Sequence, residues 1–219
     1  MLLFSVIAHE IAHGYAALKQ GDPTAYQLGR LTWNPVKHID PFLTIILPLV
    51  MILAGQGVLG GAKPVPVNPR NYRNFKRGDI IVSLAGVATN AVISIGCVIL
   101  IAILGAVVRF VPDARSTVEI AQGILVYGVV LNWILIIFNL LPIPPLDGSH
   151  IMKYLLPPAW SLQYSHFGAR FGFLILIGLM IIAPGVLGRL LMPAIYIAGA
   201  LVGLVNPLLL PGYGDWMPR

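Results

Sequence analysis

Long apolar runs separated by short polar segments dominate the pattern of this chain. Apolar residues fill 1–19, 80–110, 118–141, 167–183 and 186–209 with few interruptions. A helix of about 20 residues crosses the hydrocarbon layer of a bilayer, so each run predicts a membrane-spanning helix. Glycine and proline follow the first run and separate the last two, as expected where helices end. The pattern therefore predicts an all-α polytopic membrane protein with about five to six transmembrane helices.

Three other parts of the chain depart from this pattern. Residues 24–41 carry β-forming and turn residues, which predict a short membrane-associated β segment. Residues 42–59 are apolar but contain proline and glycine, and the prolines and charges over 60–79 argue against a helix there. Residues 151–166 are amphipathic and predict a piece that lies at the membrane interface.

The placement of lysine and arginine indicates whether 42–59 crosses the membrane, because these residues concentrate on the cytoplasmic side. If the segment does not cross, all basic residues except Arg109, Arg115 and Arg189 fall on one side. If it crosses, the bias disappears. We therefore expect 42–59 to dip in and return, or to lie buried against other helices. This leaves five spans, a cytoplasmic C-terminus and a first helix that runs from outside to inside.

The composition agrees with a multi-pass protein of the cell membrane. Hydrophobic residues make up 58% of the chain and charged residues 10%, compared with about 25% charged residues in soluble domains. The net charge of +6 comes from the loops, so we interpret it as membrane orientation and not as binding to nucleic acid. Cys97 is the one cysteine and excludes an intramolecular disulfide.

The first apolar run contains the pattern His9-Glu10-Ile11-Ala12-His13. Residues i and i+4 share a helix face, so both imidazoles can bind one zinc ion. Glu10 lies beside His9, close enough to accept a proton from a zinc-activated water. The alternative is two buried histidines satisfied by backbone carbonyls, but hydrocarbon penalises three polar groups that lack partners. The pattern therefore favours a metal site.

A catalytic zinc usually takes a third protein ligand, and the chain offers few candidates. Asp147 follows an apolar helix within 138–150, where prolines allow the backbone to turn back toward the core. Its alternative role is the N-cap of a helix over 150–156. The remaining acidic residues and two histidines fall in loops, at helix ends or at the interface, where solvated side chains are the simpler interpretation: Asp22, Asp40, Asp79, Asp113, Glu119, Asp215, His38 and His166.

These motifs resemble those of the site-2 protease family of intramembrane zinc metalloproteases. The likeness rests on residues 9–13, on Gly86-Val87-Ala88-Thr89-Asn90 and on the stretch from Asn139 to Gly148. Residues 21–41 and 62–74 also look like those of the bacterial and archaeal members that lack a PDZ domain. Val87 departs from the many members that have proline at this position, which affects the helix geometry more than the chemistry.

The resemblance covers roughly residues 1–150 and implies a three-helix catalytic core. It suggests a catalytic membrane part over 1–150 and a C-terminal part over 151–219 with an interfacial segment and a helix pair. The catalytic part then comprises the zinc-binding helix 1–19, a strand, re-entrant and basic loop region over 20–79, the helices 80–110 and 118–141, and an Asp-Gly loop over 142–150.

The resemblance makes Asp147 the third ligand of one Zn²⁺ per chain, with His9 and His13, and makes Glu10 the general base. It also suggests that Asn90 and Asn139 hydrogen-bond the substrate backbone, although from the residues alone either could join helices. The implied activity is hydrolysis of peptide bonds in the transmembrane segments of single-span membrane proteins, by zinc-activated water. The implied active site opens toward the cytoplasm; the oligomeric state is left open.

Two other functions fit a metal site in a membrane protein. A metal transporter would use the same ligands, but it has no use for a base fixed beside the metal and commonly shows repeated halves. A non-catalytic, protease-like scaffold would bind substrates without cutting them. The presence of Glu10 argues against the scaffold, because loss of the base is the easiest route to inactivity.

Overall fold

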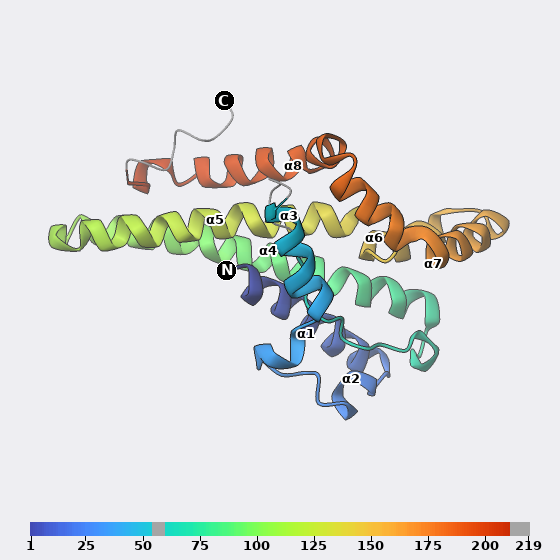
Figure 1. Cartoon of the computed structure of the whole chain (residues 1–219). Helices are drawn as coiled ribbons and strands as arrows, with labels where there is room; N and C mark the ends of the chain where they lie inside the picture. Colours follow the sequence, from blue (N-terminus) through green and yellow to red (C-terminus); the bar gives the residue numbers. More distant parts are fainter. Residues whose placement is uncertain (54–59, 211–219) are drawn as a thin grey trace. The chain divides into compact units, whose positions relative to one another are not determined.

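The structure is a computed structural model that describes residues 1–53 and 60–210 (Figure 1). Within these ranges it contains helices, turns and extended segments but no strand. The α-helices are α1 (Leu2–Gln20), α2 (Thr24–Gln27), α3 (Leu47–Leu53), α4 (Phe75–Val108), α5 (Arg115–Leu140), α6 (Asp147–Leu155), α7 (Pro158–Ile181) and α8 (Pro184–Gly203). The all-α architecture is thus confirmed for the described residues.

The first helix ends where its sequence predicts. Gly21 has φ +111°, a conformation that glycine adopts without steric cost. Its N–H bonds the carbonyl of Leu18 at 3.1 Å, and the N–H of Asp22 bonds the carbonyl of Ala17 at 2.9 Å. These two bonds form a Schellman motif, which satisfies carbonyls at the end of α1.

The region predicted to form strands, 24–41, forms helical turns instead. After α2, a 3-10 turn spans Pro35–His38, and π-helical turns over Pro41–Ile46 lead into α3. The side chain of Asn34 accepts a backbone N–H at the start of the first turn, and Asp40 accepts two at the start of the second. The strand prediction is wrong here, because capping side chains followed by proline favour helical turns over a β ladder.

Two further boundaries differ from the predicted ones. α4 begins at Phe75, inside the segment expected to be non-helical, because the last proline of that segment is Pro69 and Asn74 accepts the N–H of Arg77 at 3.0 Å as a cap. α7 begins at Pro158 and continues to Ile181, so the predicted interfacial piece over 151–166 is divided between α6 and the start of a spanning helix. The break falls at Pro157-Pro158, since proline ends one helix and is favourable in the first turn of the next.

Within the described residues, four helices are long and apolar enough to cross a membrane: Phe75–Val108, Pro112–Leu140, Pro158–Ile181 and Pro184–Gly203. The sequence predicted five to six spanning helices. α1 is not among these four, because His9, Glu10 and His13 reduce its mean hydropathy. Of the predicted re-entrant segment 42–59, residues 42–53 form short helical turns and 54–59 lie outside the described residues.

The outward face of α4 is apolar, as contact with the lipid of a membrane requires. Val92, Ile95, Ile99 and Ile103 follow helical spacing, and each is more than half exposed. A continuous apolar stripe of this kind is unusual on a soluble protein and is suited to contact with lipid.

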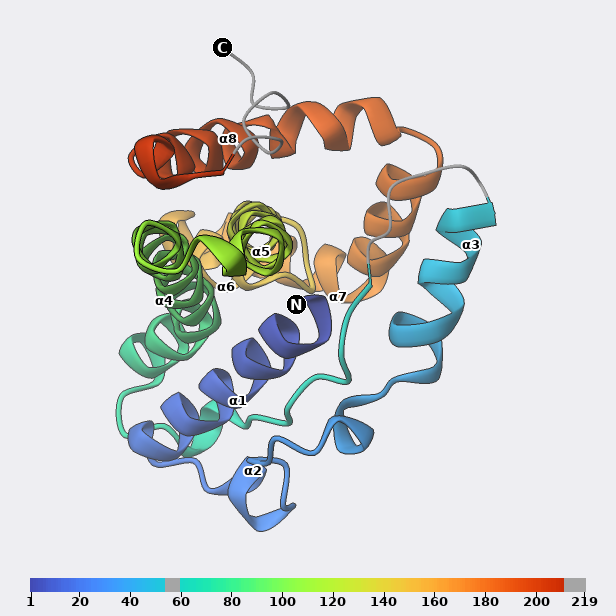
Figure 2. The same ribbon diagram turned by 90° about the vertical axis from the view of Figure 1, so that its left-hand side faces the viewer.

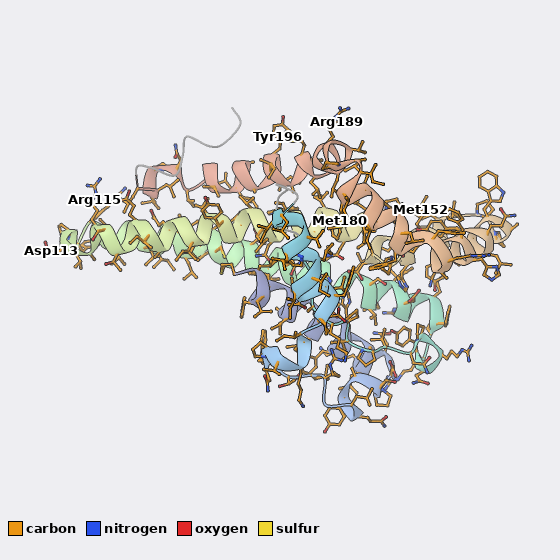
Figure 3. The ribbon with its side chains drawn as sticks, in the orientation of Figure 1. Asp113, Arg115, Met152, Met180, Arg189 and Tyr196 are labelled. Atoms are coloured by element: carbon orange, nitrogen blue, oxygen red, sulfur yellow. The ribbon has the colours of Figure 1, made fainter. Side chains whose placement is uncertain are left out.

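The chain divides into two compact units, which are described separately. The first, the hairpin unit, consists of Met1–Leu2, Asn90–Phe138 and Leu190–Arg219. In it α4 and α5 form a hairpin beside α8 (Figure 2), around a buried core of Cys97, Ile101, Val126, Val129, Ala198 and Val202. Asp113 and Arg115 lie at the polar end of the hairpin (Figure 3).

The second unit, the site unit, consists of Leu3–Thr89 and Asn139–Arg189. It contains most of α1, the first four turns of α4, and α6 and α7. An extended segment over 60–68 runs beside α1 (Figure 2). The residues that carry the predicted zinc site, 9–13 and 147, all belong to this unit.

Candidate metal centre

The two histidines of the HExxH motif lie on the buried face of α1. His9 is 5% exposed and His13 is 9% exposed. Their Nε2 atoms are 2.9 Å apart, which is the consequence of placing them four residues apart on one helix. The helix therefore aims both imidazoles at a common point.

The backbone of α4 orients the second of these rings. Nδ1 of His13 lies 2.7 Å from the carbonyl oxygen of Val82. A carbonyl can only accept, so Nδ1 carries the proton and Nε2 is left with a lone pair. A carbonyl partner of this kind is the usual way in which a protein fixes the tautomer of a metal-binding histidine.

A glycine of α4 makes room for the other ring. A β-carbon placed on Gly86 would overlap the imidazole of His9, whose ring atoms are its three nearest neighbours. No other residue type leaves this space free, so glycine at position 86 is what allows α4 to lie against His9.

Asp147 reaches the histidines as the first residue of α6. The loop before it is packed closely: the hydroxyl of Tyr164 donates to the carbonyl of Pro142 at 3.0 Å. A β-carbon on Gly168 or Gly172 of α7 would overlap Pro144. The alternative N-cap role is not what the structure shows, since Asp147 lies within α6 and the N-cap residue is Leu146.

The three side chains form a compact group with the donor set of a catalytic zinc site. Oδ2 of Asp147 lies 3.2 Å from Nε2 of His9 and 3.4 Å from Nε2 of His13. Four-coordinate zinc with bonds of ~2.1 Å separates its ligand atoms by about 3.4 Å. Oδ2 is also buried and accepts no hydrogen bond. Two imidazoles and a carboxylate that converge in this way fit a divalent cation, which would stabilise the buried oxygen.

Glu10 has a partner that the sequence did not reveal. Its Oε2 accepts the backbone N–H of Val65 at 2.8 Å. Val65 lies in the extended segment over 60–68, between Pro64 and Pro66, which have no N–H of their own. One oxygen of Glu10 is thus held by the backbone, and Oε1 has no such bond among those described.

The two predicted substrate-binding residues fall in different units. Asn139 is half-buried in the last turn of α5 and belongs to the site unit. Asn90 is fully buried in α4 and belongs to the hairpin unit. Neither position tests the predicted role, which stays a prediction.

Three residues predicted to be solvated are buried. Asp22 and His38 are 0% exposed, and Asp79 is 3% exposed. That expectation was wrong because each side chain has internal partners. Asp22 accepts backbone N–H groups of Thr24 and Asn68, and His38 bonds the carbonyl of Thr32 at 2.8 Å. Asn68, and the residues of α6 that contact Asp79, lie far from these side chains along the chain, so local sequence does not report those partners.

Among the residues that the structure describes, His9, His13 and Asp147 form the one group of three His, Cys, Asp or Glu side chains with ligand atoms close enough to share an ion. The other histidines of the described chain do not join it. His150, for example, contacts Asp79 instead, with Nδ1 3.1 Å from Oδ1.

Comparison with known proteins finds similar sequences among zinc metalloproteases. The profile of peptidase family M50 matches residues 1–179. The chain is 36% identical over 184 residues to the Bacillus subtilis protein named "Putative zinc metalloprotease YwhC", a match that covers 84% of this chain and 80% of the relative. It is 34% identical over 180 residues to Rip2 of Mycolicibacterium smegmatis, which covers 82% of this chain and 64% of the relative. Rip2 of Mycobacterium tuberculosis H37Rv is 31% identical over 157 residues, 71% of this chain and 56% of that protein. No solved structure matches the chain.

Proposed function

Because the chain belongs to peptidase family M50, the site-2 proteases, and is thus a membrane zinc metalloprotease, we propose that it cleaves peptide bonds inside the transmembrane segments of single-span membrane proteins. One observation carries the proposal: ligand atoms of His9, His13 and Asp147 converge within 4.8 Å of one another, in a chain whose described residues include four helices long and apolar enough to cross a membrane. A protease that such helices hold in a membrane meets substrates that lie in the same bilayer.

In this proposal His9, His13 and Asp147 hold one zinc ion. Bound there, zinc would supply Lewis-acid chemistry, polarising a carbonyl and lowering the pKa of water toward ~7. Glu10 accepts the proton of the attacking water and returns it to the amine of the leaving peptide. The N–H of Val65 donates to Oε2 of Glu10 and so holds the orientation of the carboxylate that takes up the proton.

The remaining polar residues have substrate roles in this proposal. A substrate helix hides its carbonyls in internal hydrogen bonds, so the segment to be cut must unwind. The amides of Asn139 and Asn90 then hydrogen-bond the exposed peptide groups. The bias of basic residues supports an active site that opens toward the cytoplasm, the side from which water would enter.

The test is cleavage of a single-span substrate reconstituted with the detergent-purified protein, with products identified by mass spectrometry. We expect cuts within the apolar segment, with zinc restoring the activity that a chelator removes. Glu10→Gln serves as the matched control, because it leaves the three ligands in place and removes the base. Cuts confined to the water-exposed flanks of the substrate, or full activity of Glu10→Gln, would refute the proposal.

The same purified protein distinguishes the protease hypothesis from the metal-transporter hypothesis. A transporter would carry zinc into proteoliposomes, and Glu10→Gln would carry it as fast. If the protein is a protease, we expect no zinc uptake beyond that of empty vesicles. The scaffold would retain zinc but leave every unwound substrate intact.

A further inference from the structure

Asp79 is a buried carboxylate for which the proposed chemistry has no use. It lies in the second turn of α4 and is 3% exposed. Nδ1 of His150 lies 3.1 Å from its Oδ1, and the hydroxyl of Tyr154 donates to its Oδ2 at 2.9 Å. The ammonium of Lys153 pairs with the same Oδ2. A buried carboxylate with three partners is costly to build, and all three come from one short helix, α6.

That helix begins with the predicted ligand. α6 contains nine residues, from Asp147 to Leu155. Asp147, His150 and Tyr154 are spaced i, i+3 and i+7, so they share one face of the helix. The face that presents Asp147 to the histidines is therefore the face that Asp79 holds. Because a helix is stiff over two turns, whatever fixes its second half also fixes its first residue.

The same face of α4 contacts both histidines. Asp79, Val82 and Gly86 have the same i, i+3, i+7 spacing. The carbonyl of Val82 bonds His13, and Gly86 lies against the ring of His9. One stripe of α4 thus touches His9 and His13 directly and reaches Asp147 through α6. α4 contributes none of the three predicted ligands, but it supports all three, either by direct contact or through α6.

From this arrangement we propose that Asp79 is a positioning residue for the metal centre: it locks α6 to the helix that orients both histidines and so sets the distance of Asp147 from them. The inference rests on the proposed zinc site. A neutral amide at position 79 would lose the charge-assisted bond to Lys153 and weaken the contact with His150. α6 would then shift relative to α1, and Asp147 with it.

The experiment is a double-mutant cycle on zinc affinity, measured by competition with a chromophoric chelator on the detergent-purified full chain. Its four members are wild type, Asp79→Asn, Asp147→Ala and the double variant. We expect Asp79→Asn to weaken zinc binding about tenfold, at the lower end of what residues that support metal ligands contribute. In the Asp147→Ala background the same substitution should have no further effect, since there is no ligand left to position.

A purely structural role for Asp79 gives a different result. It would lower zinc affinity by the same factor in both backgrounds, through a general loss of the folded state. That outcome overturns the inference, and so does wild-type affinity in Asp79→Asn. Asp22→Asn is the matched control, because Asp22 is also a buried carboxylate with several donors but none of them lies on α6. It should lower stability and leave zinc affinity unchanged.

Two further readouts keep the inference separate from folding and from the proposed function. If Asp79→Asn does not fold, Tyr154→Phe removes one of the three bonds and should weaken zinc binding by a smaller factor, again only when Asp147 is present. Equal affinity of Tyr154→Phe and wild type would then overturn the inference. If Asp147→Ala binds zinc with wild-type affinity, the proposed metal site is refuted. If Asp147→Ala binds zinc more weakly but Asp79→Asn binds it with wild-type affinity, only the positioning role is refuted.

Discussion

Adding a single methyl group at Gly86 should disrupt the metal centre although every predicted ligand keeps its own side chain. A β-carbon at this position would lie 2.5 Å from Nε2 and 2.6 Å from Nδ1 of His9, whereas ordinary contacts begin at 3.4 Å. The ring must therefore recede by about 1 Å. Metal sites tolerate errors of roughly 0.2 Å in ligand distance. Gly86→Ala should thus weaken zinc binding about 10- to 100-fold, the range found when the support of a ligand is removed.

The assay is chelator competition for zinc on the detergent-purified protein, with thermal unfolding followed in parallel. Overpacking a well-packed site costs about 1–3 kcal/mol, so the variant should remain folded but less stable. Gly96→Ala is the matched control, because it lies in the same helix and a β-carbon there meets nothing within 4 Å. It should bind zinc like wild type.

The reasoning is refuted if Gly86→Ala retains wild-type zinc affinity, since the overlap with His9 would then be relieved without moving the ring. It is also refuted if Gly96→Ala weakens zinc binding as strongly, because any extra methyl group in α4 would then suffice. A fall in stability with unchanged zinc affinity would show that the backbone, and not the imidazole, absorbs the overlap.

Three other parts of the chain can be tested by single substitutions or by labelling. Glu10→Gln should keep a full complement of zinc and lose about 10²- to 10⁴-fold in peptide hydrolysis, the usual contribution of a general base; loss of zinc together with activity would contradict its role. Burial alone would raise the pKa of Asp22, but the hydrogen bonds that it accepts lower that pKa below its ordinary value. Its stabilising effect is therefore present above the ordinary pKa of ~3.9 and is lost as the pH falls through the lowered value. Asp22→Asn should be less stable than wild type at pH 7, and the gap in melting temperature should close in acid; a gap that does not change with pH would contradict this. In a Cys97→Ser background, a cysteine at Arg73 should react with an impermeant maleimide only from the cytoplasmic face and one at Arg115 only from the other face. Labelling of both from one face would overturn the topology derived from charge.

The sequence carried most of the local information about this protein. The length of the apolar runs predicted the spanning helices, since backbone groups in lipid must bond within their own helix. The break at Gly21 predicted the end of α1, because only glycine takes that conformation without cost. The i, i+4 spacing of His9 and His13 predicted a shared site, because a helix face follows from spacing alone. Asn34 and Asp40 are capping residues followed by proline, but their β-forming neighbours led to a prediction of strands.

Other features were decided only by contacts between distant segments. No local pattern shows that α6 returns Asp147 to within 3.4 Å of the histidines, that Val65 donates to Glu10, or that Asp79 is buried against α6. The sequence around an aspartate that is flanked by lysines and arginines does not show whether its carboxylate is solvated or paired in the interior. Its surroundings depend on which helices pack together, and that is set by the close approach of α4 to α1 at Gly86 and by the packing of α7 on the loop before Asp147. The sequence by itself determined the long apolar helices and which residues could bind zinc. The tertiary structure decided which of these residues meet, because burial and partners are properties of packing and not of the chain.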